Sequence, residues 1–194
     1  SRPAVRLPRY DSWPAAMRWA AHIAVGAGLA AAVNPLTIPA AVIGATAPDW
    51  LEWLCKAVGQ PVRHRTVTHV LLYWLLGCIA LLLLDLGPVD SHALGFFVGG
   101  LSHVLADACT VSGVPALPWS TRRFHLLGGK LRTGGPGELV LAAAVLSVGI
   151  AISFYTGSVS KIGGYIPFFP DYHDKYTRGI VDAREWRDHR FTIF

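Results

Sequence analysis

A histidine and an aspartate four residues apart, His103 and Asp107, interrupt an otherwise apolar stretch of the sequence together with Ser102. On a helix this spacing places both side chains on one face, where they can bind the same ion. An imidazole and a carboxylate suit zinc, manganese or iron better than an ion that prefers oxygen alone. Taken by itself, the pair also fits a hydrogen-bonded core histidine and a carboxylate at a helix end.

Four further ionisable residues lie in or beside apolar segments: His22, Asp49, His64 and His69. Ionisable side chains are costly in apolar surroundings and often mark functional sites. The chemistry available to them depends on whether the fold brings them to the same place.

The apolar stretch 23–47 contains Asn34-Pro35 near its middle. Proline disfavours a helical conformation in the residue before it, so we expect a break near Asn34. Each half has about 12 residues, or about 18 Å of helix, which is too short to cross an apolar core of about 30 Å. We therefore predict a hairpin of two short helices, with His22 at its entrance and Asp49 at its exit.

A second hairpin is expected further along the chain. His69 opens an apolar helix, the chain turns at Gly87-Pro88, and a returning helix ends with His103 and Asp107. Two antiparallel hairpins bring all these groups to one level near one membrane face, which predicts a shared metal site. The alternative is a buried network of hydrogen-bonded polar side chains.

The composition supports a membrane setting. Of 194 residues, 53% are hydrophobic and 15% are charged, against about 25% charged residues in a typical soluble domain. The mean hydropathy is +0.42. This excludes a disordered chain and argues against a soluble nucleic-acid binder, so no nucleic-acid partner is expected. Three cysteines without a close pair give neither a disulfide framework nor a thiolate zinc site.

Two uncharged runs, Val70–Leu84 and Leu139–Thr156, are candidate membrane spans. The alternative, two buried helices of a soluble bundle, would require a polar stripe that neither run has. We predict an all-α, polytopic membrane helical bundle with an N-terminal helical hairpin and about three further apolar helices. Residues 1–157 form the membrane-embedded domain, and residues 158–194 form a polar, aromatic tail.

Two strings carry a family resemblance: HRTVTHVLL from His64 and GGLSHVLADACTVSGVPALPW from Gly99. They resemble the YdjM-like membrane-bound metal-dependent hydrolases, also labelled LexA-binding inner-membrane proteins. Order and spacing agree over residues 22–124. A looser likeness, to zinc-dependent phospholipase C, is an analogy of ligand types only. The shared positions are His22, Pro48-Asp49, His64-Arg65, Thr68-His69, Ser102-His103, Asp107, Thr110, Gly113 and Pro115.

The resemblance implies a hydrolase of the bacterial inner membrane, in which a divalent metal, zinc or else manganese or magnesium, activates water. We assign catalytic roles to His64 and Arg65, although His64 could also be a ligand or orient one. Thr68 and Ser102 are expected to orient a ligand, or else to cap a helix or bond to the preceding turn. The expected metal ligands are His22, Asp49, His69, His103 and Asp107.

The sequence departs from the family pattern after Asp49. Family members often read Pro-Asp-x-Asp-His, whereas Leu51 stands here in place of the second aspartate and Trp53 near the histidine position. Glu52 could substitute for the missing carboxylate, but its side chain would point in a different direction. The resemblance therefore supports one metal ion better than it supports two.

Three arginines near the site, Arg63, Arg122 and Arg123, predict binding of a phosphoester or a phospholipid headgroup, because guanidinium groups bind phosphate bidentately. The alternative is that they mark topology and contact lipid phosphates. Eleven of the 17 Lys and Arg residues fall on the site side, which favours a cytoplasmic site. Membrane lipids are the expected partners.

Two other functions stay open. The chain could be a non-catalytic subunit of a larger membrane complex, with a structural metal site and a tail that docks on other subunits. It could also be an ion transporter with a His and Asp relay, although its short hairpin helices and the lack of an inverted repeat argue against this.

Overall fold

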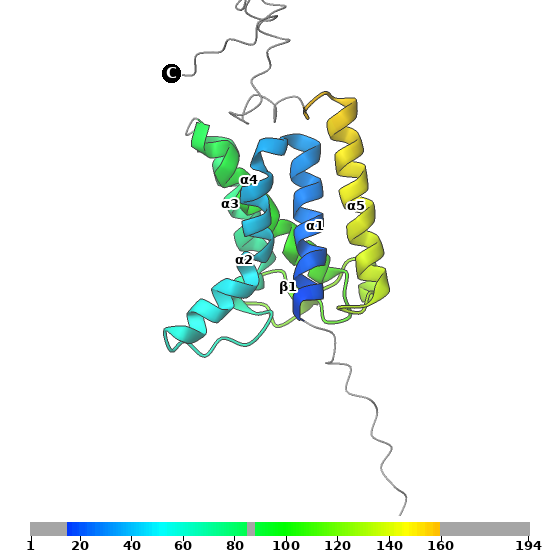
Figure 1. The fold of residues 1–194 in the computed structure, drawn as a ribbon. Coiled ribbons are helices and arrows are strands. Elements are labelled where there is room, and N and C mark those ends of the chain that lie inside the picture. Colours follow the sequence, from blue (N-terminus) through cyan, green and yellow to red (C-terminus); the bar gives the residue numbers. More distant parts are fainter. Residues whose placement is uncertain (1–14, 85–87, 160–194) are drawn as a thin grey trace, which may run out of the picture.

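The computed structural model describes residues 15–84 and 88–159, and almost all of the predicted tail lies outside this part. Most described residues are helical, as predicted, and the helices form a single bundle (Figure 1). The helices are α1 (Ala15–Val33), α2 (Ile38–Ala57), α3 (Leu71–Leu84), α4 (Pro88–Ala108) and α5 (Pro136–Tyr155). The short 3-10 helices are η2 (Pro35–Thr37), η3 (Val67–His69) and η4 (Leu127–Gly129).

The helices pack around α1 and α4. Helix α4 contacts α1, α2 and α3, and α5 packs along the other side of α1. Between α4 and α5 the chain crosses one end of the bundle and forms a small antiparallel pair, β1 (Val114–Pro115) with β2 (Arg123–Phe124). This strand pair and an isolated bridge between Thr110 and Leu131 are the described departures from the predicted all-α fold. The end of the bundle that carries it is called the loop end below.

The predicted N-terminal hairpin is present. The turn at η2 is held by Asn34, whose side-chain oxygen accepts a hydrogen bond from the Leu36 backbone N–H, 3.3 Å away. The Thr37 hydroxyl donates to the Asn34 carbonyl at 2.8 Å. A cap of this kind satisfies backbone groups that the break at proline leaves unpaired.

The predicted limits of the hairpin helices were too narrow. Helix α1 has 19 residues. Helix α2 has 20 residues, because it continues through Pro48 instead of ending there. A proline inside a helix removes one hydrogen bond and bends the helix without necessarily ending it. After Pro48 the end of α2 bends away from the bundle (Figure 1). His22 and Asp49 therefore lie within helices, yet still at the same end of the hairpin.

Small residues let the helices approach closely. A Cβ atom on Gly44 of α2 would overlap the carbonyl of Phe96 in α4, and one on Gly149 of α5 would overlap the carbonyl of Gly28 in α1. In membrane helices such contacts replace the hydrophobic driving force, because the surroundings are themselves apolar. These backbone contacts therefore fix the distances between the helices that carry the site residues.

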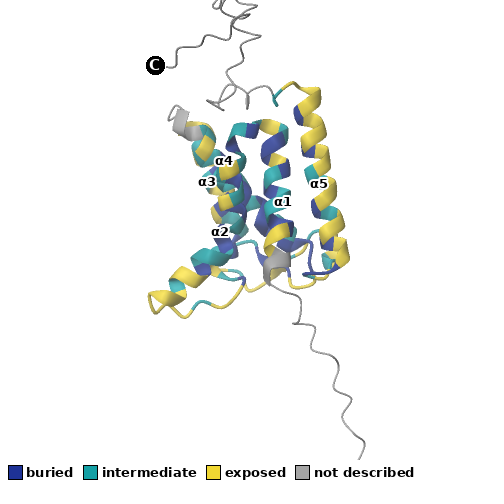
Figure 2. Cartoon of the chain, viewed as in Figure 1, coloured by how far each residue is buried: buried dark blue, intermediate teal, exposed yellow. Residues whose placement is uncertain are grey.

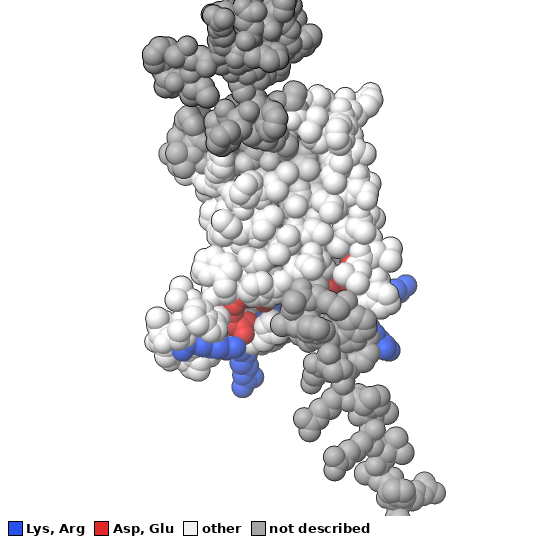
Figure 3. Space-filling view, in the orientation of Figure 1, with Lys and Arg blue, Asp and Glu red and all other residues white. Residues whose placement is uncertain are grey.

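Between residues 19 and 159, every Lys and Arg lies in segments at the loop end of the bundle. Four long segments contain no Asp, Glu, Lys or Arg: 19–48, 66–84, 91–106 and 139–159. The face in Figure 3 accordingly has a white body with its blue and red side chains at the lower end. Large apolar side chains, such as Leu83 of α3 and Phe154 of α5, are exposed on the body, and the exposed strips of these two helices are visible in Figure 2.

One described helix, α5, is both long enough and apolar enough to cross a membrane. Its most apolar window is only 22% buried inside the molecule, which is unlike the core helix of a soluble bundle. Helix α3 is apolar but has 14 residues, about 21 Å of helix. Among the described helices, one membrane-span candidate is thus identified where the sequence predicted two, and it corresponds to the second predicted run.

Candidate metal centre

Four segments bring five of the predicted site residues to one place near the loop end. Helix α1 provides His22, α2 provides Asp49, η3 provides His69, and α4 provides both His103 and Asp107. All except Asp49 are buried, and the Asp49 side chain is 21% exposed. The predicted convergence of the two hairpins is therefore present in the fold.

A backbone carbonyl fixes the orientation of His103. The Nδ1 atom lies 2.7 Å from the carbonyl oxygen of Ala45 in α2. A carbonyl can only accept, so Nδ1 carries the proton and Nε2 presents its lone pair to the centre. Histidine ligands of metals are commonly held in this way.

His69 is held by its neighbour in the sequence. The Thr68 hydroxyl lies 3.0 Å from Nδ1 of His69, which leaves Nε2 directed to the centre. The carbonyl of Thr68 accepts a hydrogen bond from Trp74 Nε1 at 2.9 Å, and this bond ties η3 to α3. Thr68 therefore occupies the orienting position predicted for it.

Ser102 bonds to the preceding turn of its own helix, which is the alternative role predicted for it. Its hydroxyl donates to the carbonyl of Gly99 in the preceding turn, at 2.7 Å. That hydrogen bond lies within α4, so Ser102 contributes to the helix and the Thr68 hydroxyl is the one that bonds to a candidate ligand.

The two imidazoles face two carboxylates at distances too long for hydrogen bonds. His69 Nε2 lies 3.5 Å from Asp49 and 3.7 Å from Asp107, and His103 Nε2 lies 3.9 and 3.7 Å from the same carboxylates. Within the described residues, neither Nε2 atom has a hydrogen-bond partner although both are fully buried. Buried polar atoms rarely remain unpaired.

These distances fit ligands that share a cation. Two atoms that are each about 2.1 Å from a tetrahedral zinc lie about 3.4 Å apart. Nitrogen from imidazole and oxygen from carboxylate form a donor set suited to zinc, manganese or iron. The residues present therefore fit a divalent metal.

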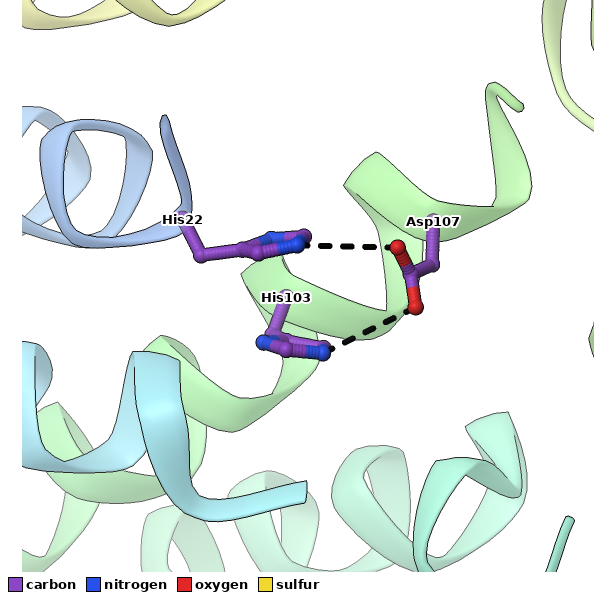
Figure 4. Close-up of side chains that lie close together, drawn as sticks. All are labelled: His22, His103 and Asp107. Atoms are coloured by element: carbon purple, nitrogen blue, oxygen red, sulfur yellow. Dashed lines mark ion pairs between the residues drawn. The ribbon is translucent and has the colours of Figure 1, made fainter. Parts of the chain in front are cut away.

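His22 adds a third imidazole. Its Nε2 lies 3.6 Å from Oδ1 of Asp107, and its ring stacks on that of His103 with centroids 3.8 Å apart. In Figure 4 both rings extend from their helices toward the Asp107 carboxylate. The potential ligand atoms form two adjacent groups, His22 with His103 and Asp107, and Asp49 with His64 and His69.

Arg65 neutralises one carboxylate of the centre. Its Nη2 donates to Oδ1 of Asp107 at 2.6 Å, and its Nη1 donates to the hydroxyl of Thr110 at 3.1 Å. This buried arginine adopts a φ of 56°, and its carbonyl accepts a hydrogen bond from Arg123 at 2.6 Å. Arg65 thus positions Asp107, and the catalytic role expected from the sequence stays a prediction.

Glu52 connects His64 to the site, a role that the sequence reasoning did not assign. Its carboxylate accepts hydrogen bonds from Lys56 at 2.6 Å and is paired with His64 Nδ1 at 2.8 Å. Burial alone would raise the pKa of Glu52, but the hydrogen bonds and charges of Lys56 and His64 outweigh it and hold this pKa below its usual value. The spacing of Glu52 and Lys56, four residues apart on one helix, signals their pairing, but no local pattern signals the pairing of Glu52 with His64, twelve residues away.

A cavity of about 250 Å³ opens onto the centre. Trp19, Glu52, His64, Arg65 and Thr133 line it together with His22, Asp49, His103 and Asp107. A small molecule or a headgroup can therefore reach the convergent imidazoles and carboxylates. Of the three predicted phosphate-binding arginines, Arg63 and Arg122 are exposed outside this cavity, and Arg123 bonds to the backbone of Arg65.

The sequence model of a protein family described as YdjM inner membrane protein matches residues 17–162. This span covers well over half of the chain and includes all of the candidate ligands. The chain belongs to the YdjM family. The resemblance read from the His64 and Gly99 strings is thereby confirmed at the level of the family, whose description and relatives place it in the bacterial inner membrane.

Curated relatives match part of the chain. The inner membrane proteins YdjM of Escherichia coli (strain K12) and Shigella flexneri are each 35% identical over 103 residues, covering 46% of this chain and 52% of the relative. The uncharacterized protein YvsG of Bacillus subtilis (strain 168) is 36% identical over 95 residues, covering 48% and 58%. The chain spans about half the length of these relatives. No solved structure matches it.

Proposed function

We propose that the chain is a membrane-bound metal-dependent hydrolase that acts on a phosphoester or a lipid-linked substrate. The observation that carries this proposal is the pair of buried, unpartnered Nε2 atoms of His69 and His103, which face the carboxylates of Asp49 and Asp107. A divalent ion bound there supplies a Lewis acid that makes hydroxide available near neutral pH.

The protein's own groups prepare the site for this chemistry. Thr68 and the Ala45 carbonyl orient the two imidazoles, and Arg65 holds Asp107 in place. His64 is paired with Glu52 through Nδ1, so its Nε2 is the ring atom available to exchange a proton with water or a leaving group. The cavity beside these residues gives a substrate access to them.

We further propose that the bundle is inserted as a multi-pass unit with the loop end toward the cytoplasm. The support is the distribution of charge, because every Lys and Arg from residue 19 to residue 159 lies between residues 56 and 132, in segments at the loop end. Cytoplasmic segments of membrane proteins carry an excess of Lys and Arg.

The decisive experiment combines metal analysis with turnover on the full chain purified in detergent. We expect bound zinc or manganese, and metal-dependent hydrolysis within a panel of phosphomonoesters, phosphodiesters and phospholipids. His103→Ala should lower metal occupancy and reduce turnover by about 100-fold or more, since removing even a residue that only orients a ligand costs 10- to 100-fold.

His92→Ala is the matched control, because His92 is an exposed histidine on the same helix, outside the cluster. It should leave metal content and turnover unchanged. A protein that binds metal through His103 but turns over no member of the panel would instead support the non-catalytic subunit. A protein that binds no metal would contradict both functions.

A further inference from the structure

A second cavity, of about 380 Å³, lies beside the metal centre and shares one lining residue, Arg65, with the first. It is formed where η3 and the start of α3 meet the segment that contains β1 and β2. We call it the outer cavity. None of the proposed metal ligands lines it.

One wall of the outer cavity is polar and basic. Thr66, Ser120 and Thr121 contribute hydroxyl groups, and Arg123 contributes a guanidinium. Among the described residues, Arg123 makes one side-chain hydrogen bond, from Nη1 to the Arg65 carbonyl. A guanidinium has five N–H donors, so Nη2 and Nε can still bind an anion. No acidic residue lines the cavity to compete for it.

The other wall is apolar and continuous with the outward face of α3. Val67, Val70 and Tyr73 form it, and the side chains of Val67 and Tyr73 are 56% and 46% exposed. From Tyr73 the helix continues through exposed leucines to Leu84 with no charged residue. The outer cavity thus lies at the boundary between the charged loop end and the charge-free body.

We propose that the outer cavity binds an anionic phospholipid, with its phosphate at Arg123 and its acyl chains along α3. A guanidinium and nearby hydroxyls match a phosphate group, and an exposed apolar helix matches an acyl chain. This proposal does not require the metal centre to be catalytic, because no metal ligand takes part in the binding.

Lipid binding to the detergent-purified full chain tests the proposal without any measurement of turnover. Dioleoylphosphatidylglycerol should be retained in native mass spectrometry. A photoactivatable analogue should crosslink to residues 66–73 and 115–123. Glycerol 3-phosphate and dioleoylglycerol, which carry the anion and the chains separately, should each bind at least about tenfold more weakly, because each lacks one half of the contacts.

Two variants locate the site. Arg123→Gln should weaken phosphatidylglycerol binding by about tenfold or more, because it removes a charged hydrogen-bond donor. Thr121→Trp should block the cavity while leaving Arg123 and its bond to Arg65 in place. Arg122→Gln removes a neighbouring exposed arginine that does not line the cavity, and it should bind as the parent does.

The results separate the possible binding sites. Equal losses in Arg122→Gln and Arg123→Gln, or undiminished binding in Thr121→Trp, would overturn the outer cavity as the lipid site. Glycerol 3-phosphate that binds as tightly as the lipid would show a site for a soluble anion and would also overturn the proposal. Loss of metal with intact lipid binding would count against the proposed hydrolase and leave the lipid site standing.

Discussion

Hydrogen bonds behind the imidazoles determine what the metal centre can bind. The Ala45 carbonyl and the Thr68 hydroxyl each engage the Nδ1 atom of a histidine, so both histidines turn Nε2 inward. Arg65 uses one oxygen of Asp107 and leaves the other facing His69 and His103. The centre is therefore oriented by neighbours that would not themselves touch an ion.

The hydroxyl of Thr68 should be needed for tight metal binding. Thr68→Val keeps the shape of the side chain but removes the partner of His69 Nδ1, so zinc affinity should fall by about 10- to 100-fold. Competition with a fluorescent zinc chelator measures the change. Ser102→Ala is the control, because its hydroxyl bonds within α4, and equal losses in both variants would contradict the orienting role of Thr68.

The pairing of Glu52 with Lys56 and His64 should stabilise the fold in a pH-dependent way. Glu52→Gln should lower the free energy of unfolding at neutral pH by about 1 kcal/mol, since the charged hydrogen bonds are partly exposed. A carboxylate with a lowered pKa stabilises above its unfolded value, near 4.5, and that stabilisation is lost as the pH falls through the folded value.

Chemical denaturation between pH 2 and pH 7 measures this difference. The gap between the parent and Glu52→Gln should close as the pH falls below about 4.5. A gap that stays constant over this range would show that the charge of Glu52 is not what stabilises the network.

The residues of the centre and the orienting role of Thr68 could be predicted from the sequence, but the other supports could not. His103 and Asp107 stand out because polar groups four residues apart within an apolar stretch share a helix face. The Ala45 carbonyl on His103 and the Arg65 guanidinium on Asp107 depend on which backbone and side-chain groups meet across helices. No local pattern in the sequence specifies such contacts.

At the scale of the elements, backbone contacts through glycine set the distances between helices. Gly149 of α5 faces the carbonyl of Gly28 in α1, and Gly99 of α4 faces the carbonyl of Ala41 in α2. Because α1, α2 and α4 carry most of the candidate ligands, a change in these distances is transmitted to the centre.

Gly149→Val should separate α1 from α5. The new side chain would overlap the Gly28 backbone, which cannot move as a flexible side chain can, so we expect a loss of about 2 to 3 kcal/mol in the free energy of unfolding. Thermal unfolding in detergent measures it. Ala151→Val lies two residues further on an exposed face and should change stability little; a similar loss there would argue against the close contact.

The two hairpins could be predicted, whereas the lengths of their helices could not. Asn34-Pro35 correctly marks the first turn, since the residue before a proline avoids the helical conformation. The same rule fails at Pro48, where α2 continues for nine more residues to Ala57 and bends instead. Ala47 before this proline and Leu51 after it both pack in the core cluster that contains Val104 of α4, and such tertiary contacts are not visible in the local sequence.

At the scale of the whole molecule, the charge-free body and the charged loop end predict a single orientation in the membrane. Gln60→Cys, in the exposed loop after α2, should resist a membrane-impermeant maleimide in intact spheroplasts and react in inverted vesicles. Ser158→Cys, after α5, should show the opposite pattern. Both variants are made in a chain with Cys55, Cys78 and Cys109 replaced by Ala.

Labelling of both cysteines from the same side would contradict a membrane crossing by α5. A fully reversed pattern would retain the crossing but place the metal centre outside the cytoplasm. Arg122→Cys, also at the loop end, should label with Gln60→Cys and serves as the internal control.

If the bundle is inserted as proposed, the uneven distribution of ionised side chains also makes its orientation permanent. For the protein to turn over in the bilayer, Lys56, Arg122 and the other cations of the loop end would have to pass through hydrocarbon together, at a cost of about 3 kcal/mol for each charge. Thermal motion does not supply this much free energy during the life of a cell. Whichever leaflet receives the loop end during synthesis keeps it, and every copy of the protein works on the same side.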